Sequence, residues 1–153
     1  NLATLKPSNP QTSNPQTRNH LVSMNHQDLY DSTCFACSRL ITLRYSTSFS
    51  MGIRLFHRRF RPPIYAIYGF VRFADEIVDT FHDYPKQVLL ERFREDTYRA
   101  IDEGISLNPV LHAFQQVVRK YGIDRELIDA FLRSMEMDLY NCAVSLRRRA
   151  SCP

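Results

Sequence analysis

Glycine is scarce in this sequence, and long apolar runs are absent from it. Only 4 of the 153 residues are glycine, while 44% are hydrophobic and 24% are charged. This composition is typical of a globular chain rather than of a disordered or fibrous one, and its length suits one domain with one core. No run approaches the roughly 18 uncharged residues that a membrane-spanning helix needs. The polar, proline-rich start lacks the apolar core of a signal peptide.

The four cysteines form neither a disulfide framework nor a repeated metal-binding pattern. Cys34 and Cys37 make one C-x-x-C pair, but Cys142 and Cys152 do not repeat that spacing, and no paired histidines lie nearby. Because the pair lies in a helical pattern, we interpret both residues as buried or half-buried structural thiols; a metal or redox role is the alternative. Cysteine usage of this kind fits a reducing compartment, so we expect a cytoplasmic protein.

A strong charge of one sign is also missing from the body of the chain. The formal net charge is +4, but five of the 20 basic residues lie before Met24 or after Tyr140. Residues 24–140 therefore hold 15 basic and 16 acidic side chains, a net charge of −1. This balance disfavours a nucleic-acid-binding surface over the body, and we expect no nucleic-acid partner.

The two ends of the chain differ from the body. Residues 8–17 repeat SNPQT twice, and such a polar segment has little to bury. The first methionine is Met24, where a helical pattern begins. We therefore interpret residues 1–23 as a disordered leader outside the native fold, 24–140 as one helical domain, and 141–153 as an aberrant tail left by a frameshift or truncation.

Apolar side chains recur every three or four residues through the body, so the sequence predicts an all-α fold of about five or six helices. Prolines follow Arg61 in a predicted first turn, Asn108 is a predicted N-cap, and Gly104 and Gly122 each follow a helical pattern. No segment of useful length alternates apolar and polar residues as a strand would. The predicted helices span 28–45, 62–84, 86–101, 108–122 and 124–139.

The predicted helix 62–84 is apolar nearly all round but carries one polar strip. At about 100° per residue, Tyr68, Arg72, Asp75 and Asp79 fall within a strip about 60° wide. The strip places two carboxylates one turn apart on a helix that should be buried. This arrangement is costly, because like charges repel and buried charges lose hydration.

Two interpretations of this strip stay open from spacing alone. In the first, Arg72 neutralises the two aspartates as a structural ion cluster. In the second, Asp75 and Asp79 coordinate a divalent cation, because Mg²⁺ takes one or two protein carboxylates and completes its shell with water and phosphate oxygens.

Two other polar stretches precede this helix. Residues 46–50 read STSFS between two predicted helices, and hydroxyl clusters of this kind cap helices or close turns, although they also donate to phosphate oxygens. The stretch 54–61 carries four arginines around His57. Our default interpretation of the basic stretch is a solvated face. The alternative is contact with an anionic substrate or with membrane headgroups, which would make the protein peripheral at a membrane.

Three motifs occur together in the body: S-x-S-F at 46–49, A-I-Y at 66–68 and R-x-x-D-E-x-x-D at 72–79. Together they resemble the squalene/phytoene synthase family, and the stretch 65–80 is most similar to its bacterial phytoene synthase branch. The resemblance extends over 46–138, and more loosely from the first methionine. It implies that the body is the N-terminal part of an all-helical prenyl synthase fold.

The resemblance also implies a reaction, the head-to-head condensation of two allylic prenyl diphosphates through a cyclopropyl intermediate. Two C20 geranylgeranyl diphosphates would give phytoene for carotenoid biosynthesis, whereas C15 farnesyl diphosphate would give squalene or dehydrosqualene. Carried over by position, Asp75 and Asp79 would bind Mg²⁺, or Mn²⁺, together with the substrate diphosphate. Arg72 and Tyr68 would line the diphosphate region and take part in catalysis. The adjacent flap that contacts substrate would contain Ser46, Ser48 and Phe49.

One part of the family pattern is missing, because nothing acidic follows Asp138 and the second aspartate-rich motif of the family is therefore absent. We expect the missing C-terminal half of the same enzyme as a partner and no activity from this chain alone. A terpene cyclase or a head-to-tail prenyltransferase would more often show adjacent aspartates, and the lack of Glu-x-x-His argues against a di-iron bundle. The non-enzymatic alternative is a helical interaction module in which the polar strip is only an ion cluster.

Overall fold

The structure, a computed structural model, describes residues 25–150, with side chains as far as Asn141. Within this range the chain forms six α-helices and one short 3₁₀-helix, and it contains no strand, which confirms the predicted all-α fold. The leader 1–23 lies outside the described residues. The elements are α1 (His26–Tyr45), α2 (Thr47–Ile53), η1 (Arg58–Phe60), α3 (Arg61–Asp79), α4 (Lys86–Glu103), α5 (Pro109–Tyr121) and α6 (Arg125–Ala150).

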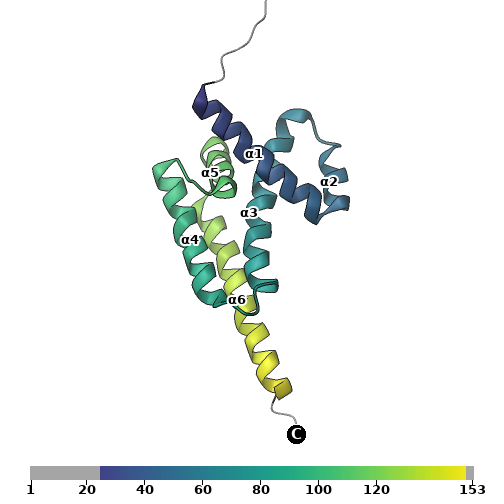
Figure 1. The fold of residues 1–153 in the computed structure, drawn as a ribbon, viewed down its shortest axis with the longest axis vertical. Helices are drawn as coiled ribbons and strands as arrows, with labels where there is room; N and C mark the ends of the chain where they lie inside the picture. The colour runs from purple at the N-terminus through teal and green to yellow at the C-terminus, as the bar shows by residue number, and fades with distance from the viewer. Residues whose placement is uncertain (1–24, 151–153) are drawn as a thin grey trace, which may run out of the picture.

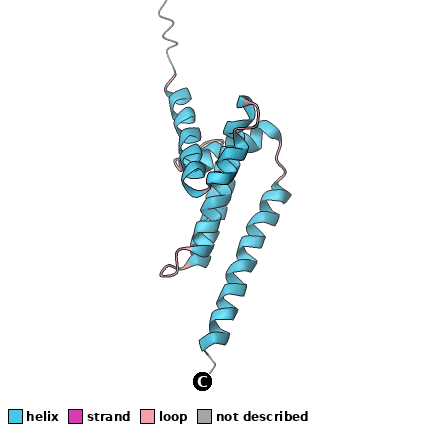
Figure 2. Ribbon diagram, turned by 90° about the vertical axis from the view of Figure 1, so that its right-hand side faces the viewer, coloured by secondary structure: helices cyan, strands magenta, loops and turns pink. Residues whose placement is uncertain are grey.

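Helix α3 lies at the centre of the arrangement and contacts α1, α4, α5 and α6. Figure 1 shows α3, α4 and the first half of α6 running side by side, with α1 crossing α3 near its start. Figure 2 shows that α6 continues well past the other helices as one straight element. No helix in the described part of the chain is long and apolar enough to cross a membrane.

The core forms where α3, α4, α5 and α6 meet around Phe70. The Phe70 ring stacks on the ring of Phe114, with centroids 3.9 Å apart, and the centroid of Phe93 lies 5.4 Å away. Phe131 adds a tilted ring at 5.5 Å from α6. Each of these rings removes a large apolar area from water, so this cluster fixes α3 against its neighbours.

The ends of α4 and α5 lie close to where the sequence predicted them. Gly104 follows α4 with φ 73° and Gly122 follows α5 with φ 63°, both in the left-handed region that glycine adopts without strain. The Asn108 side chain accepts hydrogen bonds from the N–H groups of Val110 and Leu111 and so caps α5, as predicted.

Helix α3 is shorter than the predicted helix 62–84. It ends at Asp79, and the next five residues form a bend and turns that lead to Pro85. Pro85 disfavours the helical conformation at Tyr84, so α3 could not have run on into α4. Phe81, which the sequence included in the helix, lies outside it and is 38% exposed.

Helix α6 also differs from its prediction. It passes Tyr140 without a break, whereas the sequence pattern indicated an end to the body there. Of the α6 side chains that the structure describes, Ile128 and Leu132 are buried, at 3% and 0% exposure; helical spacing places both Leu127 and Ile128 on its apolar side, but Leu127 is 64% exposed. Phe131, Met135 and Leu139 are partly buried against the same core, so the expected apolar side of α6 does face α3 and α4, with Leu127 as the exception.

Candidate functional site

The polar strip of α3 lies on an accessible side of that helix. The side chains of Arg72 and Asp75 are 25% and 34% exposed, Tyr68 is half-buried, and Asp79 is exposed. The fully buried residues of α3 lie on its other sides. The structure therefore brings the four predicted residues of α3 onto one face that a ligand can reach.

Arg72 is held by Glu76 rather than by the two aspartates. Its Nη2 donates to Glu76 Oε1 at 2.6 Å, whereas its nearest approach to the Asp75 carboxylate is 4.0 Å. The guanidinium also lies over the ring of Tyr45, with Cζ 4.4 Å from the ring centroid. An ion cluster is thus present, in which Glu76 is the close partner of Arg72 and Asp75 a distant one. The Nε of Arg72 is buried and has no hydrogen-bond partner among the described residues, so one donor remains unused.

Hydrogen bonds keep the Glu76 carboxylate ionised. The Thr80 hydroxyl, Arg72 and the Tyr45 hydroxyl all hydrogen-bond to this carboxylate and hold the pKa of Glu76 below its usual range. The same contacts raise the pKa of Arg72 and the pKa of Tyr45. Because the Glu76 side chain is only 13% exposed, this network fixes the orientation of the Arg72 guanidinium.

Asp75 is in the opposite situation, with its negative charge poorly compensated. Burial is the main cause that raises the pKa of Asp75; Arg72 opposes the rise, and the carboxylates of Asp79, Glu76 and Asp138 add to it. Asp138 belongs to α6, so two helices contribute negative charge around this position. Asp79 takes part in no ion pair with any residue that the structure describes.

The residues present suit a hard divalent cation. Asp75 and Asp79 offer carboxylate oxygens, the ligands that Mg²⁺ prefers, and a cation would offset the negative charge that Arg72 leaves uncompensated. In the part of the chain that the structure describes, no group of three or more His, Cys, Asp or Glu side chains is arranged to hold a metal ion. A cation here would therefore take its remaining ligands from water and from a bound anion.

The STSFS segment begins a helix instead of connecting two helices. Ser46 is the N-cap of α2, and its Oγ accepts a hydrogen bond from the Phe49 N–H at 3.2 Å, which confirms the capping interpretation for this hydroxyl. Ser50 Oγ donates to the Ser46 carbonyl oxygen at 2.5 Å. Ser48 is the second residue of α2 and is exposed.

Aromatic rings join α1 and α2 to the polar strip. The ring of Phe49 stacks on that of Tyr68, with centroids 4.9 Å apart and planes 25° from parallel. Tyr45, the last residue of α1, contacts Arg72 in the same region. Sequence reasoning missed Tyr45 and Glu76 as site residues. Both adjoin the motifs, since Tyr45 directly precedes the S-x-S-F motif and Glu76 lies inside R-x-x-D-E-x-x-D.

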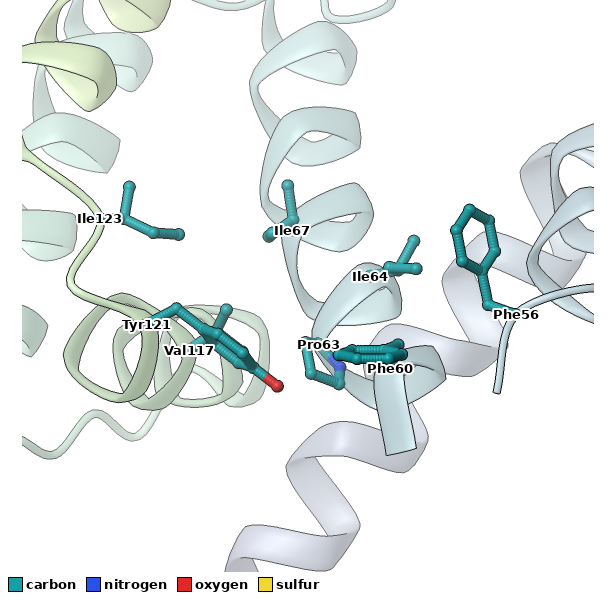
Figure 3. Close-up of a pocket in the computed structure, with 8 residues that line it drawn as sticks. All are labelled: Phe56, Phe60, Pro63, Ile64, Ile67, Val117, Tyr121 and Ile123. Atoms are coloured by element: carbon teal, nitrogen blue, oxygen red, sulfur yellow. The ribbon is translucent and has the colours of Figure 1, made fainter. Parts of the chain in front are cut away.

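An apolar cavity of about 380 Å³ lies at the start of α3 (Figure 3). Figure 3 shows side chains from η1 and α3 on one side of this space and side chains from α5 and the following loop on the other. Ile64 lies about three turns, or about 16 Å, before Asp75 and on nearly the same side of the helix. The lining residues are Phe56, Phe60, Pro63, Ile64, Ile67, Val117, Tyr121 and Ile123.

The C-x-x-C pair lies apart from this site, on α1. Cys34 is buried and Cys37 is half-buried, and both are free thiols, which confirms the structural interpretation of their burial. Burial raises the pKa of the Cys34 thiol and so favours its neutral form.

The helical arrangement is that of part of an all-α isoprenoid synthase fold. Among known families, squalene/phytoene synthase matches residues 42–150, so this chain belongs to the squalene/phytoene synthase family. The match confirms the resemblance and continues beyond Asp138, where the sequence motifs had indicated its end.

Part of this chain also matches a curated protein. A presqualene diphosphate synthase from Rhodopseudomonas palustris (strain ATCC BAA-98 / CGA009) is 32% identical over 94 residues, which cover 61% of this chain and 33% of that protein. The chain thus spans about a third of the length of the curated relative that it matches. No solved structure gives a significant match.

Proposed function

We propose that this chain is the N-terminal part of a prenyltransferase that condenses two prenyl diphosphates head to head. The observation that carries the proposal is the Asp75–Asp79 pair, whose negative charge the described residues leave largely uncompensated on an accessible face. Family membership supports the reaction type. The apolar cavity further along the same helix supports a substrate that joins an anionic end to a hydrocarbon chain.

Asp75 and Asp79 would hold Mg²⁺, or Mn²⁺, against the substrate diphosphate. When bound, the metal supplies Lewis-acid stabilisation of the negative charge on the leaving diphosphate. Arg72 would bind the same anion, because Glu76 orients its guanidinium and the side chain stays 25% exposed. A guanidinium fixed in advance stabilises developing charge without first having to reorganise.

The α2 residues would close the site on the side away from the metal. Ser48 is exposed, and its hydroxyl could donate to a phosphate oxygen, whereas Ser46 would hold the start of α2 in place through its capping bond. The stacked rings of Phe49 and Tyr68 would form an aromatic wall beside the reacting carbon atoms. Such a wall excludes water, which would otherwise capture the carbocation that forms when the carbon–oxygen bond ionises.

We infer a preference for C20 substrates from the position of the cavity. Each isoprene unit adds about 5 Å to an extended chain at ordinary carbon–carbon bond lengths. A C15 chain that starts at Asp75 would reach Ile64, about 16 Å along α3, and fill only the near part of the cavity, whereas a C20 chain would extend through it to Phe60, about 22 Å away. Two geranylgeranyl diphosphates would then give phytoene, for carotenoid biosynthesis. The name of the relative favours a second candidate, the condensation of farnesyl diphosphate to presqualene diphosphate.

The test measures Mg²⁺-dependent binding of a non-hydrolysable geranylgeranyl diphosphate analogue by thermal shift. The analogue should raise the melting temperature of the chain only when Mg²⁺ is present, and Asp75→Asn with Asp79→Asn should abolish the shift. Glu95→Gln removes one carboxylate from an exposed position on α4 and should leave the shift intact. A shift that persists in the double variant would contradict the metal assignment. The absence of any shift in the unmodified chain would favour the interaction module.

A further inference from the structure

The segment between α2 and α3 exposes apolar and basic side chains together. Leu55 is 89% exposed and Phe56 is 54% exposed, and at the end of α2 Met51 is 63% exposed. Large apolar side chains that cluster in water mark an interaction site more often than chance exposure. Exposed basic side chains flank Leu55 and Phe56 in the sequence: Arg54, His57, Arg58 and Arg59.

Internal hydrogen bonds give this segment a fixed shape. Arg61 Nε donates to the Phe56 carbonyl oxygen at 3.0 Å, and its Nη2 donates to the Arg54 carbonyl oxygen at 2.7 Å. His57 caps η1, and its Nδ1 accepts from the Arg59 N–H at 3.4 Å. The arginine that closes the loop is thus used internally, so the loop needs no partner to hold its backbone in place.

The same segment borders a basic hollow of about 590 Å³ as well as the apolar cavity of Figure 3. The hollow is lined by Arg39 of α1 together with Arg54, Arg58 and Arg61, and its lining includes no acidic residue. Among the described residues, the first three of these arginines take part in no ion pair. Positive charges gathered in this way repel one another, and a bound anion would offset the repulsion.

We propose that the 54–60 segment docks on a bilayer that contains anionic phospholipids. Arg39, Arg54 and Arg58 bind headgroup phosphates in the basic hollow, and Leu55 and Phe56 insert among the first carbons of the acyl chains. A free phosphate or an acidic polymer would match the arginines but would leave Leu55 in water. An interfacial lipid layer satisfies both kinds of side chain at once.

Given the proposed function, docking on lipid also suits the chemistry of the apolar cavity. Prenyl diphosphates and their hydrocarbon products partition into bilayers, and Phe56 lies both on the docking segment and in the cavity lining. The docking itself requires neither metal nor substrate. Asp75→Asn with Asp79→Asn should therefore bind vesicles as the unmodified chain does, so failure of the proposed function and failure of this proposal are distinguishable.

The first experiment is co-sedimentation with vesicles of phosphatidylcholine and phosphatidylglycerol, compared with phosphatidylcholine alone. The chain should bind the anionic vesicles, and added salt should weaken the binding. Replacing Arg39, Arg54 and Arg58 with Gln should lower the partition coefficient at least tenfold, because each arginine near an anionic surface contributes about fivefold. The matched control removes the same charge from exposed positions elsewhere and should change binding less than about twofold. The control substitutions are Arg92→Gln, Lys120→Gln and Arg133→Gln.

The second experiment uses the absence of tryptophan from the sequence. Leu55→Trp gives a single fluorescent reporter, whose emission should shift to the blue with anionic vesicles and be quenched by brominated phospholipid. Leu107→Trp is the control, because Leu107 is 91% exposed in the loop before α5, and its emission should not change. Equal shifts at both positions would overturn the proposal, as would equal binding to neutral vesicles. If inorganic diphosphate stabilises the chain through the same arginines and vesicles do not bind, the hollow is a small-anion site and the proposal is wrong.

Discussion

Replacing Glu76 with Gln should destabilise the chain, whereas the corresponding change at the adjacent Asp75 should not. Gln keeps the size of Glu76 but removes the charge that accepts from Arg72 at 2.6 Å and from the hydroxyls of Thr80 and Tyr45. A hydrogen bond to a charged group contributes about 1.5–3 kcal/mol, and partial exposure of Arg72 lowers that figure. We expect Glu76→Gln to lower the free energy of unfolding by about 1–2 kcal/mol near neutral pH.

Asp75→Asn should act in the opposite direction. Burial and the neighbouring carboxylates raise the pKa of Asp75, which means that its charge is less favourable in the folded chain than in water. A like-charge pair one helical turn apart costs about 0.2–0.5 kcal/mol, and Asn removes this repulsion towards Asp79. The expected result is a small gain in stability, about 0.3 kcal/mol, because the side chain is 34% exposed and partly screened.

Urea unfolding followed by circular dichroism, with EDTA present to remove metal, measures both changes. Glu95→Gln on the exposed side of α4 is the control and should stay within about 0.5 kcal/mol of the unmodified chain. The pKa of Glu76 is lowered on folding, so its contribution is present at neutral pH and is lost as the pH falls through the folded-state pKa. The difference between Glu76→Gln and the unmodified chain should therefore close as the pH falls below 4.5, the ordinary pKa of the group. Changes of the same sign at the two neighbouring positions would refute this account.

Three further predictions follow from the fold and the proposed function. Deleting residues 1–23 should change the free energy of unfolding by less than about 0.5 kcal/mol, and a larger loss in thermal or urea unfolding would show that the segment packs on the helices. The 153-residue chain alone should give no phytoene from geranylgeranyl diphosphate and Mg²⁺, because its described residues supply only one carboxylate pair for the metal; detectable product by chromatography would contradict the need for a second motif. In an active enzyme completed with a C-terminal half, Ile64→Phe should fill part of the cavity and shift the preference in kcat/KM from C20 towards C15 substrates, and an unchanged ratio would count against the inferred path along α3.

The family match supports the resemblance that the sequence motifs indicated. The motifs at 46–49, 66–68 and 72–79 together resembled those of the family and were enough to indicate it. The match over 42–150 confirms that inference. The roles of Ser46, Ser48, Phe49, Tyr68 and Arg72 remain predictions, as do the metal ligands and the boundaries of the domain.

Local interactions determined what the sequence alone could predict. Helix periodicity placed Asp75 and Asp79 on one face, and the Asn108 cap and Gly122 bounded α5, because each feature depends only on residues a few positions apart. Where the prediction went wrong, a more distant residue intervened. The packing of α6 against α3 and α4, which precede it in the sequence, buried Leu132 and left Leu127 exposed.

Tertiary structure decided the electrostatics of the site and the shape of its cavity. Arg72 had acidic residues at both i+3 and i+4, and Tyr45 from α1 helps to fix its pairing with Glu76. Asp138 adds its charge near Asp75 only because α6 packs beside α3. The apolar cavity likewise combines side chains from η1, α3 and α5. Sequence spacing fixes the direction of a side chain on its own helix, but the neighbours it meets depend on how the helices pack, and that packing is settled by contacts between residues far apart in the chain.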